Sequence, residues 1–181
     1  MFDKYETRIP GCYELQPIVR ADSRGQFVKT FHHEYFEQNE LETSIREQYY
    51  SVSQKGVLRG MHFQKPPHVH SKIVYCTSGT ILDVALDLRI DSPTYGAHIS
   101  LEISAESGNI LYLPEGLAHG FYSLTGATVV YNVSSVYNPE SDAGVLWSSI
   151  GMDWPDPAPD LSERDTTFPN LEEFNSPFSF D

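Results

Sequence analysis

Long apolar runs are missing from this sequence of 181 residues, and cysteine and basic residues are scarce. No run approaches the roughly 18–20 apolar residues that cross a bilayer, and the first residues (MFDKYETRIPG) have no signal-peptide core, so we expect no membrane partner. Cys12 and Cys76 are too few and too far apart for a disulfide framework, which favours the cytoplasm. The net charge of −13 argues against nucleic acid as a partner.

The shortage of cations is confined to the end of the chain. Residues 90–181 hold one basic residue, Arg164, against 14 acidic ones, whereas residues 20–89 hold nine basic and eight acidic residues. We therefore expect any anionic ligand to contact the cations of residues 20–89. These cations are Arg20, Arg24, Lys29, Arg46, Lys55, Arg59, Lys65, Lys72 and Arg89.

Long helical patterns are also missing, and short β-branched or aromatic runs alternate with Gly, Ser, Asn and Pro. Strands at this spacing, without helices of 10–15 residues between them, predict an all-β sandwich or barrel. The predicted strands cover 73–76, 81–88, 98–103, 110–113 and 127–136.

Only short helices are expected, one at 33–39 and at most one more after Ser162. No internal repeat or low-complexity linker divides the sequence, so we predict a single domain over 1–181. Its core is expected over about 22–152, and a proline-rich tail over about 153–181 should wrap the surface.

The run from Ile81 to Leu88 alternates, and Asp83 and Asp87 fall on the same face as Ile81 and Ala85. An outward-facing strand would explain two carboxylates on one face. A partly polar barrel interior that holds a ligand would explain them equally well. The periodicity leaves both interpretations open.

The histidines raise the question of a metal site. His68 and His70 have the i, i+2 spacing that puts two imidazoles on one side of a strand, and Gly108 to His119 fits the second cupin motif, G-x5-P-x-G-x2-H. The first cupin motif requires a glutamate four or five residues after its second histidine, where Val74 and Tyr75 stand. We therefore predict a cupin barrel without a metal ion.

His62 has neighbours that suit a different chemistry. Arg59, Gly60 and His62 lie in one extended stretch, GVLRGMHFQKPP. A cation, a flexible glycine and an imidazole together would suit an anionic ligand from which a proton is moved.

Several segments in sequence order make a specific pattern. They are LRGMHFQ at 58–64, Lys72 in HSKIVY, LDVALDLRIDSPTYG at 82–96, LYLPEGLAHGFYSL at 111–124, Tyr131 and Tyr137-Asn-Pro in VVYNVSSVYNP, Trp147 in GVLW, and LSERD at 161–165. Together they resemble the dTDP-4-dehydrorhamnose 3,5-epimerase family. The resemblance implies a cupin-type jelly roll without metal or cofactor, a homodimer with N-terminal strands at its interface, and epimerisation of a nucleotide-diphosphate-linked 4-keto-6-deoxy sugar.

The resemblance also implies catalytic roles. A 4-keto group acidifies the hydrogens on C3 and C5, and inversion needs a base on one face of the ring and an acid on the other. By resemblance His62 is the base, Tyr131 the acid, and Asp165 the residue that orients His62. Lys72 is placed against the enolate oxygen, where its charge stabilises the intermediate.

The remaining residues carried over from the family bind substrate. Arg59 matches a diphosphate contact, and Arg24 with Phe27, in the element RGQF, matches residues that reach a nucleotide across the dimer interface. Gln48, His119 and Asp83 match further positions of the pocket.

Departures from the family pattern concern the nucleotide more than the chemistry. Glu47-Gln48-Tyr49-Tyr50-Ser51 stands where relatives show QDN-x-S, Gln26-Phe27-Val28-Lys29 lacks an acidic residue common in the family, and 65–71 also differ. A dTDP-, GDP- or CDP-linked hexose or heptose therefore stays open, and so does epimerisation at C3 alone. A cupin ketoisomerase and a metal-binding cupin are the remaining alternatives.

Overall fold

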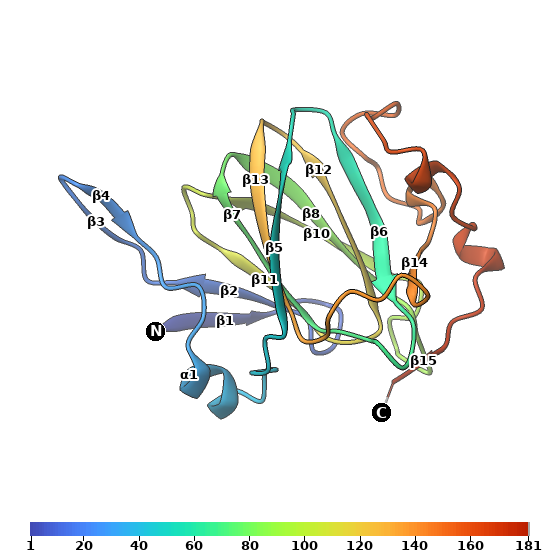
Figure 1. The fold of residues 1–181 in the computed structure, drawn as a ribbon, viewed down its shortest axis with the longest axis horizontal. Helices are drawn as coiled ribbons and strands as arrows, with labels where there is room; N and C mark the ends of the chain where they lie inside the picture. The colour runs from blue at the N-terminus through green and yellow to red at the C-terminus, as the bar shows by residue number, and fades with distance from the viewer. Residues whose placement is uncertain (181) are drawn as a thin grey trace.

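The computed structural model describes residues 1–180 and consists of two antiparallel sheets packed face to face (Figure 1). The strands follow from β-branched and aromatic runs whose side chains can be buried on a sheet. The six-stranded sheet has the order β1 (Phe2–Glu6), β2 (Tyr13–Pro17), β11 (Ile110–Leu113), β7 (Lys72–Ser78), β13 (Ala127–Val133) and β5 (Glu47–Ser53). The five-stranded sheet has the order β10 (His98–Ser104), β8 (Thr80–Asp87), β12 (Leu117–Ser123), β6 (Leu58–Gln64) and β14 (Asp142–Gly144).

Smaller elements lie outside the two sheets. β3 (Arg20–Asp22) and β4 (Gly25–Phe27) form a hairpin that projects from the body at the left of Figure 1. β9 (Arg89–Ile90) pairs in parallel with β15 (Phe178–Ser179). The helical elements are α1 (His33–Gln38) and the 3₁₀ turns η1 (Trp147–Ser149), η2 (Arg164–Thr166) and η3 (Leu171–Glu173). Among residues 1–180, no helix has the length and apolarity needed to span a membrane.

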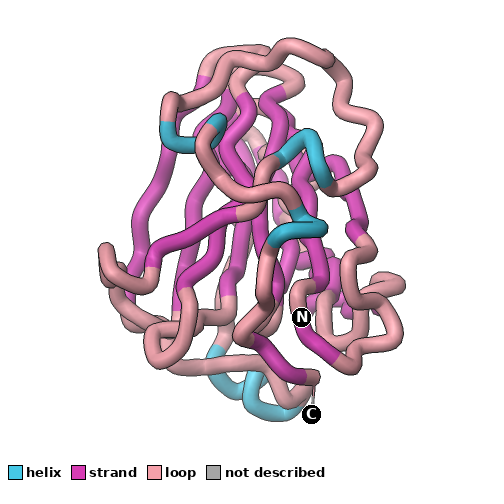
Figure 2. The backbone as a smooth tube through the Cα atoms, turned by 90° about the vertical axis from the view of Figure 1, so that its right-hand side faces the viewer, coloured by secondary structure: helices cyan, strands magenta, loops and turns pink. Residues whose placement is uncertain are grey.

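The predicted all-β class and the two short helices are confirmed, and the sheets form a sandwich that does not close into a complete barrel (Figure 2). The strand expected over 127–136 is wrong at its end, because β13 stops at Val133. The reason is the register: Val133 pairs with Glu47 and Lys72, the first residues of β5 and β7, so residues beyond it have no strand on either side.

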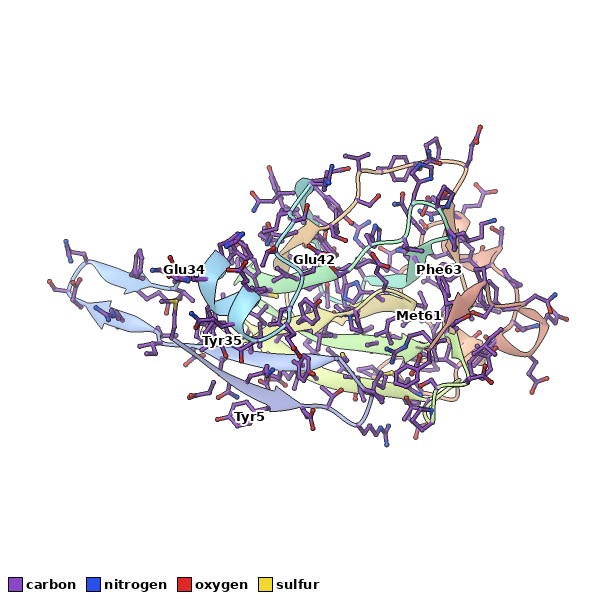
Figure 3. All side chains as sticks on the ribbon, turned by 90° about the horizontal axis from the view of Figure 1, so that it is seen from below. Tyr5, Glu34, Tyr35, Glu42, Met61 and Phe63 are labelled. Atoms are coloured by element: carbon purple, nitrogen blue, oxygen red, sulfur yellow. The ribbon has the colours of Figure 1, made fainter. Side chains whose placement is uncertain are left out.

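Apolar side chains fill three layers. The central core between the sheets contains Val74, Ala85, Phe121 and Val129. The outer face of the five-stranded sheet packs under the C-terminal tail, where Met61 and Phe63 of β6 lie between the sheet and the tail (Figure 3). The outer face of the six-stranded sheet packs under α1.

The burial of β8 on both faces settles the orientation of its carboxylates. Val84 and Leu86 belong to the cluster under the tail, whereas Ile81 and Ala85 belong to the central core. Asp83 shares the face of Ile81 and Ala85 and is fully buried. The interpretation of this face as part of a partly polar interior is therefore the right one.

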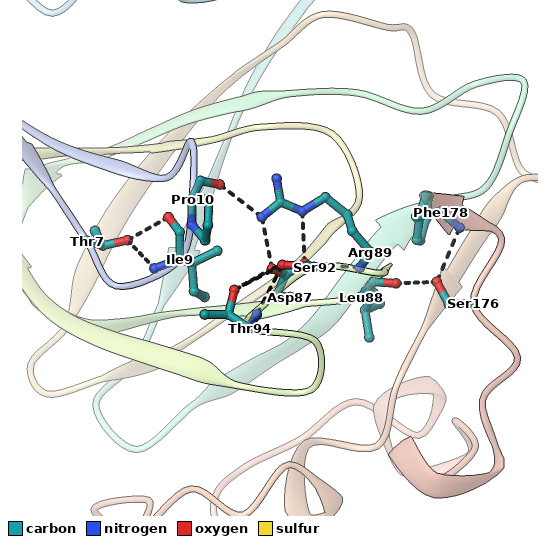
Figure 4. Close-up of polar contacts among 10 residues, drawn as sticks. All are labelled: Thr7, Ile9, Pro10, Asp87, Leu88, Arg89, Ser92, Thr94, Ser176 and Phe178. Atoms are coloured by element: carbon teal, nitrogen blue, oxygen red, sulfur yellow. Dashed lines mark hydrogen bonds and ion pairs between the residues drawn. The ribbon is translucent and has the colours of Figure 1, made fainter. Parts of the chain in front are cut away.

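A buried ion pair closes one end of the sandwich. Both oxygens of the fully buried Asp87 accept hydrogen bonds from the guanidinium of Arg89, and Ser92 and Thr94 add bonds of 2.6 and 2.7 Å (Figure 4). The same guanidinium donates to the carbonyl of Pro10 at 2.9 Å, joining β9 to the β1–β2 connection. Burial by itself raises the pKa of Asp87, but the bonds from Arg89, Ser92 and Thr94 outweigh it and lower the pKa below its usual value.

We expect Asp87→Ala to lower the free energy of unfolding by about 3–5 kcal/mol, because it leaves the buried Arg89 without its counter-ion. Urea denaturation followed by circular dichroism measures the effect. Asp91→Asn is the matched control, since it removes an exposed carboxylate nearby and asparagine tolerates the positive φ of 68° at that position. Equal midpoints for the two variants would show that the pair contributes nothing to stability.

Candidate functional site

A cavity of about 320 Å³ opens between the two sheets at the end where β6, β7 and β13 meet the 134–142 connection. Its wall is polar on several sides, and it includes two of the predicted catalytic residues. The lining residues used below are His62, Lys72, His70, Tyr49, Glu47, Tyr137, Asp142 and Arg164.

His62 and Asp165 form a hydrogen-bonded pair at this cavity. His62 Nε2 lies 2.6 Å from Asp165 Oδ1, and the buried carboxylate also accepts a bond of 3.4 Å from the Gly60 N–H. Burial by itself raises the pKa of Asp165, but the bonds from His62 and Gly60 and the charges of His62 and Arg164 outweigh it and lower the pKa. Asp165 is therefore ionised, and the hydrogen bond places the proton of neutral His62 on Nε2 and leaves Nδ1 as the basic atom.

The environment of His62 also sets its proton affinity. Burial lowers the pKa of His62, Asp165 opposes that effect, and the charges of Lys72 and Arg164 add to the lowering. The net effect is a lowered pKa of His62, so the imidazole stays neutral at pH values below its ordinary pKa. The Phe168 ring packs against the His62 ring in a T-shaped arrangement, with the ring centroids 5.7 Å apart.

Lys72 begins β7 in the opposite sheet and is 5% exposed. Its Nζ donates a hydrogen bond of 3.0 Å to the carbonyl of His62, which holds the ammonium beside the imidazole. Burial lowers the pKa of Lys72 to about 8, against the opposing charges of Asp83 and Asp142. The side chain is thus a buried cation that is protonated only up to mildly alkaline pH.

Tyr131 lies deeper, on the inner face of β13. Its ring stacks on Tyr49 with the centroids 4.8 Å apart and meets His119 edge-on at 5.8 Å, and its hydroxyl is 3.4 Å from Ser51 Oγ. Burial raises the pKa of Tyr131 well above that of a free phenol. The phenol therefore keeps its proton, and Tyr49, not Tyr131, lines the cavity.

His119 and Asp83 form a second buried pair. His119 Nε2 lies 2.6 Å from Asp83 Oδ1, and the other oxygen of Asp83 has no hydrogen-bond partner among the described residues. Neighbouring strands β12 and β8 place this pair next to Tyr131 and within the electrostatic range of Lys72. The structure thus brings His119 and Asp83 together beside Tyr131, although neither of them lines the cavity.

The predicted binding residues outside this group are exposed and lie elsewhere. Arg59 donates to Ser53 Oγ at 3.0 Å and lines a smaller pocket beside Asp165. Gln48 bonds Asn132 on the same sheet. Arg24 pairs with Asp22 at 2.6 Å on the projecting hairpin, and Phe27 is exposed there, so one subunit does not bring these two residues to its own cavity.

Several cavity residues were missed from the sequence. Arg164 pairs with Asp142 at 2.7 Å at the cavity wall, and its signal was its position as the one cation of residues 90–181. Tyr137 donates its backbone N–H to Glu47 and its hydroxyl to Asp142, at 2.6 and 3.3 Å. Both residues lie in segments that carry the family resemblance, but their contacts with Glu47 and Asp142 join different elements and cannot be read from either run by itself.

The two histidines considered for a metal do not converge. His68 Nδ1 bonds Ser141 Oγ at 3.0 Å, whereas His70 Nδ1 is 3.2 Å from Gln64 Nε2 and lines the cavity. Burial lowers the pKa of His70 to about 3, so it is neutral. Within residues 1–180 no three His, Cys, Asp or Glu side chains gather in a way that could hold a metal ion.

Comparison of the sequence and of the structure with known proteins indicates the same family. The sequence model of the family described as dTDP-4-dehydrorhamnose 3,5-epimerase matches residues 6–173. A protein of that name from Salmonella typhimurium is 37% identical over 174 residues, which cover 93% of this chain and 94% of the relative.

Solved structures extend the likeness to the whole fold. The epimerase from Legionella pneumophila, crystallised with dTDP-4-keto-L-rhamnose, superposes with a TM-score of 0.94 at 30% identity and full coverage of both chains. A 3′-monoepimerase from Streptomyces bikiniensis, in complex with dTDP-quinovose, has a TM-score of 0.87 at 36% identity, covering 92% of this chain and 86% of that one.

Proposed function

The chain belongs to the dTDP-4-dehydrorhamnose 3,5-epimerase family and is an epimerase of nucleotide-linked 4-keto sugars, and we propose that it inverts C3, C5 or both of a nucleotide-diphosphate-linked 4-keto-6-deoxy sugar through an enolate. The observation that carries this proposal is the joint presence of the His62–Asp165 pair and the buried Lys72 at one cavity. A base next to a buried cation suits removal of a proton α to a carbonyl. The reaction needs no cofactor.

His62 acts as the base in this mechanism. Nδ1 takes the proton from the sugar carbon, while Nε2–H stays bonded to Asp165, which stabilises the imidazolium that forms. The electron pair of the C–H bond moves to the carbonyl oxygen and gives the enolate. Lys72 donates to this oxygen, and its effect is large because the side chain is buried.

Tyr131 returns a proton on the other face of the ring. His62 projects from β6 of the five-stranded sheet, whereas Tyr131 projects from β13 of the six-stranded sheet, so the two groups approach a sugar between the sheets from opposite sides. Inversion requires this arrangement, because a proton removed and returned on one face restores the original configuration. The raised pKa of Tyr131 keeps the phenol protonated for this step.

The remaining residues bind the substrate. The guanidinium groups of Arg164, at the cavity, and Arg59, in the adjacent pocket, supply the positive charge for a diphosphate. His119, Asp83 and Gln48, which do not line the cavity of the single chain, are proposed as further substrate-binding residues. We further propose a homodimer in the cytoplasm in which Arg24 and Phe27 of the projecting hairpin serve the site of the neighbouring subunit.

Solvent-deuterium incorporation tests the function. Incubation with dTDP-, GDP- and CDP-linked 4-keto-6-deoxy sugars in D₂O should place deuterium at C3, at C5 or at both, with inversion seen by NMR. Exchange at C3 alone would establish a 3-epimerase, and a keto group moved to C3 would establish the ketoisomerase. Absence of exchange with every 4-keto nucleotide sugar would contradict the proposal.

We expect a bell-shaped pH profile of kcat/KM. His62 must be neutral, and because its pKa is lowered, the acidic limb should fall below about pH 6.5, the ordinary value for histidine. Lys72 must be charged, so activity should fall as the pH rises through about 8. Initial rates from pH 5 to 10 measure both limbs. An alkaline limb near pH 10 would contradict the role given to Lys72.

A further inference from the structure

Tyr49 lies directly opposite Tyr131 on adjacent strands. The two residues are in register between β5 and β13, and their rings are stacked with an interplanar angle of 19°. Tyr49 also lines the cavity, while being 42% exposed at the edge strand of the sheet. One face of the Tyr131 ring is therefore held by a side chain that itself contacts the cavity.

The other contacts of Tyr131 do not by themselves fix the orientation of its phenol. Its hydroxyl reaches Ser51 at 3.4 Å, which is a long and weak hydrogen bond. His119 meets the ring edge-on and is fixed in turn by Asp83. Because a change of χ1 rotamer would carry a tyrosine hydroxyl several ångströms away, the two ring contacts together determine where the phenol points.

We propose that Tyr49 is a positioning residue for Tyr131, and that the stacked pair aims the phenol at the sugar carbon during inversion. The inference rests on the proposed function, in which Tyr131 is the acid. In that step the phenol O–H bond breaks, a C–H bond forms from the enolate electron pair, and the phenolate regains a proton from water. His62 loses its extra proton to water.

The stack affects one half of the reaction only. Removal of the sugar proton by His62 does not involve Tyr49. If the phenol is misaligned, the enolate takes its proton back from the imidazolium on the original face, after that proton has exchanged with solvent. The result is deuterium incorporation with retention of configuration.

The experiment measures, in D₂O and with one 4-keto nucleotide sugar, the ratio of exchange with retention to inversion. Tyr49→Ala should raise this ratio by about tenfold or more, since a misplacement of about 1 Å can cost up to 10²-fold. Tyr49→Phe keeps the stacked ring and should bring the ratio back near the wild-type value. Tyr50→Ala is the matched control: the neighbouring tyrosine is 68% exposed and makes no stack with Tyr131, and we expect its removal to leave the ratio unchanged.

Tyr131→Phe separates the inference from the function on which it rests. If Tyr131→Phe inverts the sugar with the wild-type ratio, the acid role of Tyr131 is wrong. If it loses inversion while Tyr49→Ala keeps the wild-type ratio, the inference about Tyr49 is overturned and the proposed function stands. Equal losses of exchange and inversion in Tyr49→Ala would also overturn it, because they indicate only a structural role. Tyr49→Leu provides the same readout if the alanine variant does not fold.

Discussion

Replacing His62 by alanine should lower kcat/KM for epimerisation by about 10²–10⁴-fold, the range typical of a general base. The same change should suppress solvent-deuterium exchange at every carbon that the wild type exchanges, because His62 is the one imidazole among the described cavity residues that is hydrogen-bonded to a carboxylate. The buried Asp165 is left without its 2.6 Å contact, so the free energy of unfolding should fall by about 1–3 kcal/mol as well. Exchange followed by NMR measures the chemical step directly.

The control for His62→Ala is His33→Ala, an exposed histidine at the start of α1, which should leave exchange and inversion unchanged. Exogenous imidazole offers a further check, since the cavity left by the missing ring can admit it and restore part of the exchange. Undiminished exchange in His62→Ala would show that another group removes the proton. Loss of inversion with exchange retained would assign His62 to the acid step instead.

The strands were accessible from the sequence because they depend on local patterns, whereas the pairing of His62 with Asp165 was predicted only through the resemblance of their segments to a family. Alternation over 81–88 predicts a strand and its two faces. The alternation does not identify the interior face, because both faces carry apolar residues. A distant segment of the chain determines which face is covered. In the structure, Phe174 and Phe178 of the tail pack against the cluster that contains Val84 and Leu86, which leaves Asp83 facing inward.

The composition of the cavity was only partly accessible for a related reason. His62, Lys72 and Arg164 all lie in recognisable segments, but no segment by itself shows that Arg164 pairs with Asp142, 22 positions earlier in a different element. The role proposed for Tyr49 depends on its register with Tyr131, which is a property of the two paired strands and not of either sequence run by itself. The proposed contacts of the Arg24 hairpin with a second subunit lie beyond the single chain altogether.

Lys72→Met should lower kcat by about 10²–10³-fold, the loss typical when one donor to a developing oxyanion is removed. Methionine matches the length and apolar stem of lysine, so the change removes the charge and the bond to the His62 carbonyl while the buried volume is kept. Because burial of the ammonium is unfavourable, we expect stability to be maintained or slightly raised. The effect should fall mainly on kcat, since the charge acts on the enolate more strongly than on the neutral ketone.

The pH profile makes this prediction specific to Lys72. If its deprotonation near pH 8 causes the alkaline limb, Lys72→Met should lose that limb and retain the acidic one, which belongs to His62. The acidic limb should also move to higher pH, because the positive charge of Lys72 is one of the influences that lower the pKa of His62. Lys65→Met, at an exposed lysine of the adjacent loop, should retain both limbs and the wild-type rate. An alkaline limb that persists in Lys72→Met would assign it to another group, and a kcat within a few fold of wild type would remove Lys72 from the mechanism.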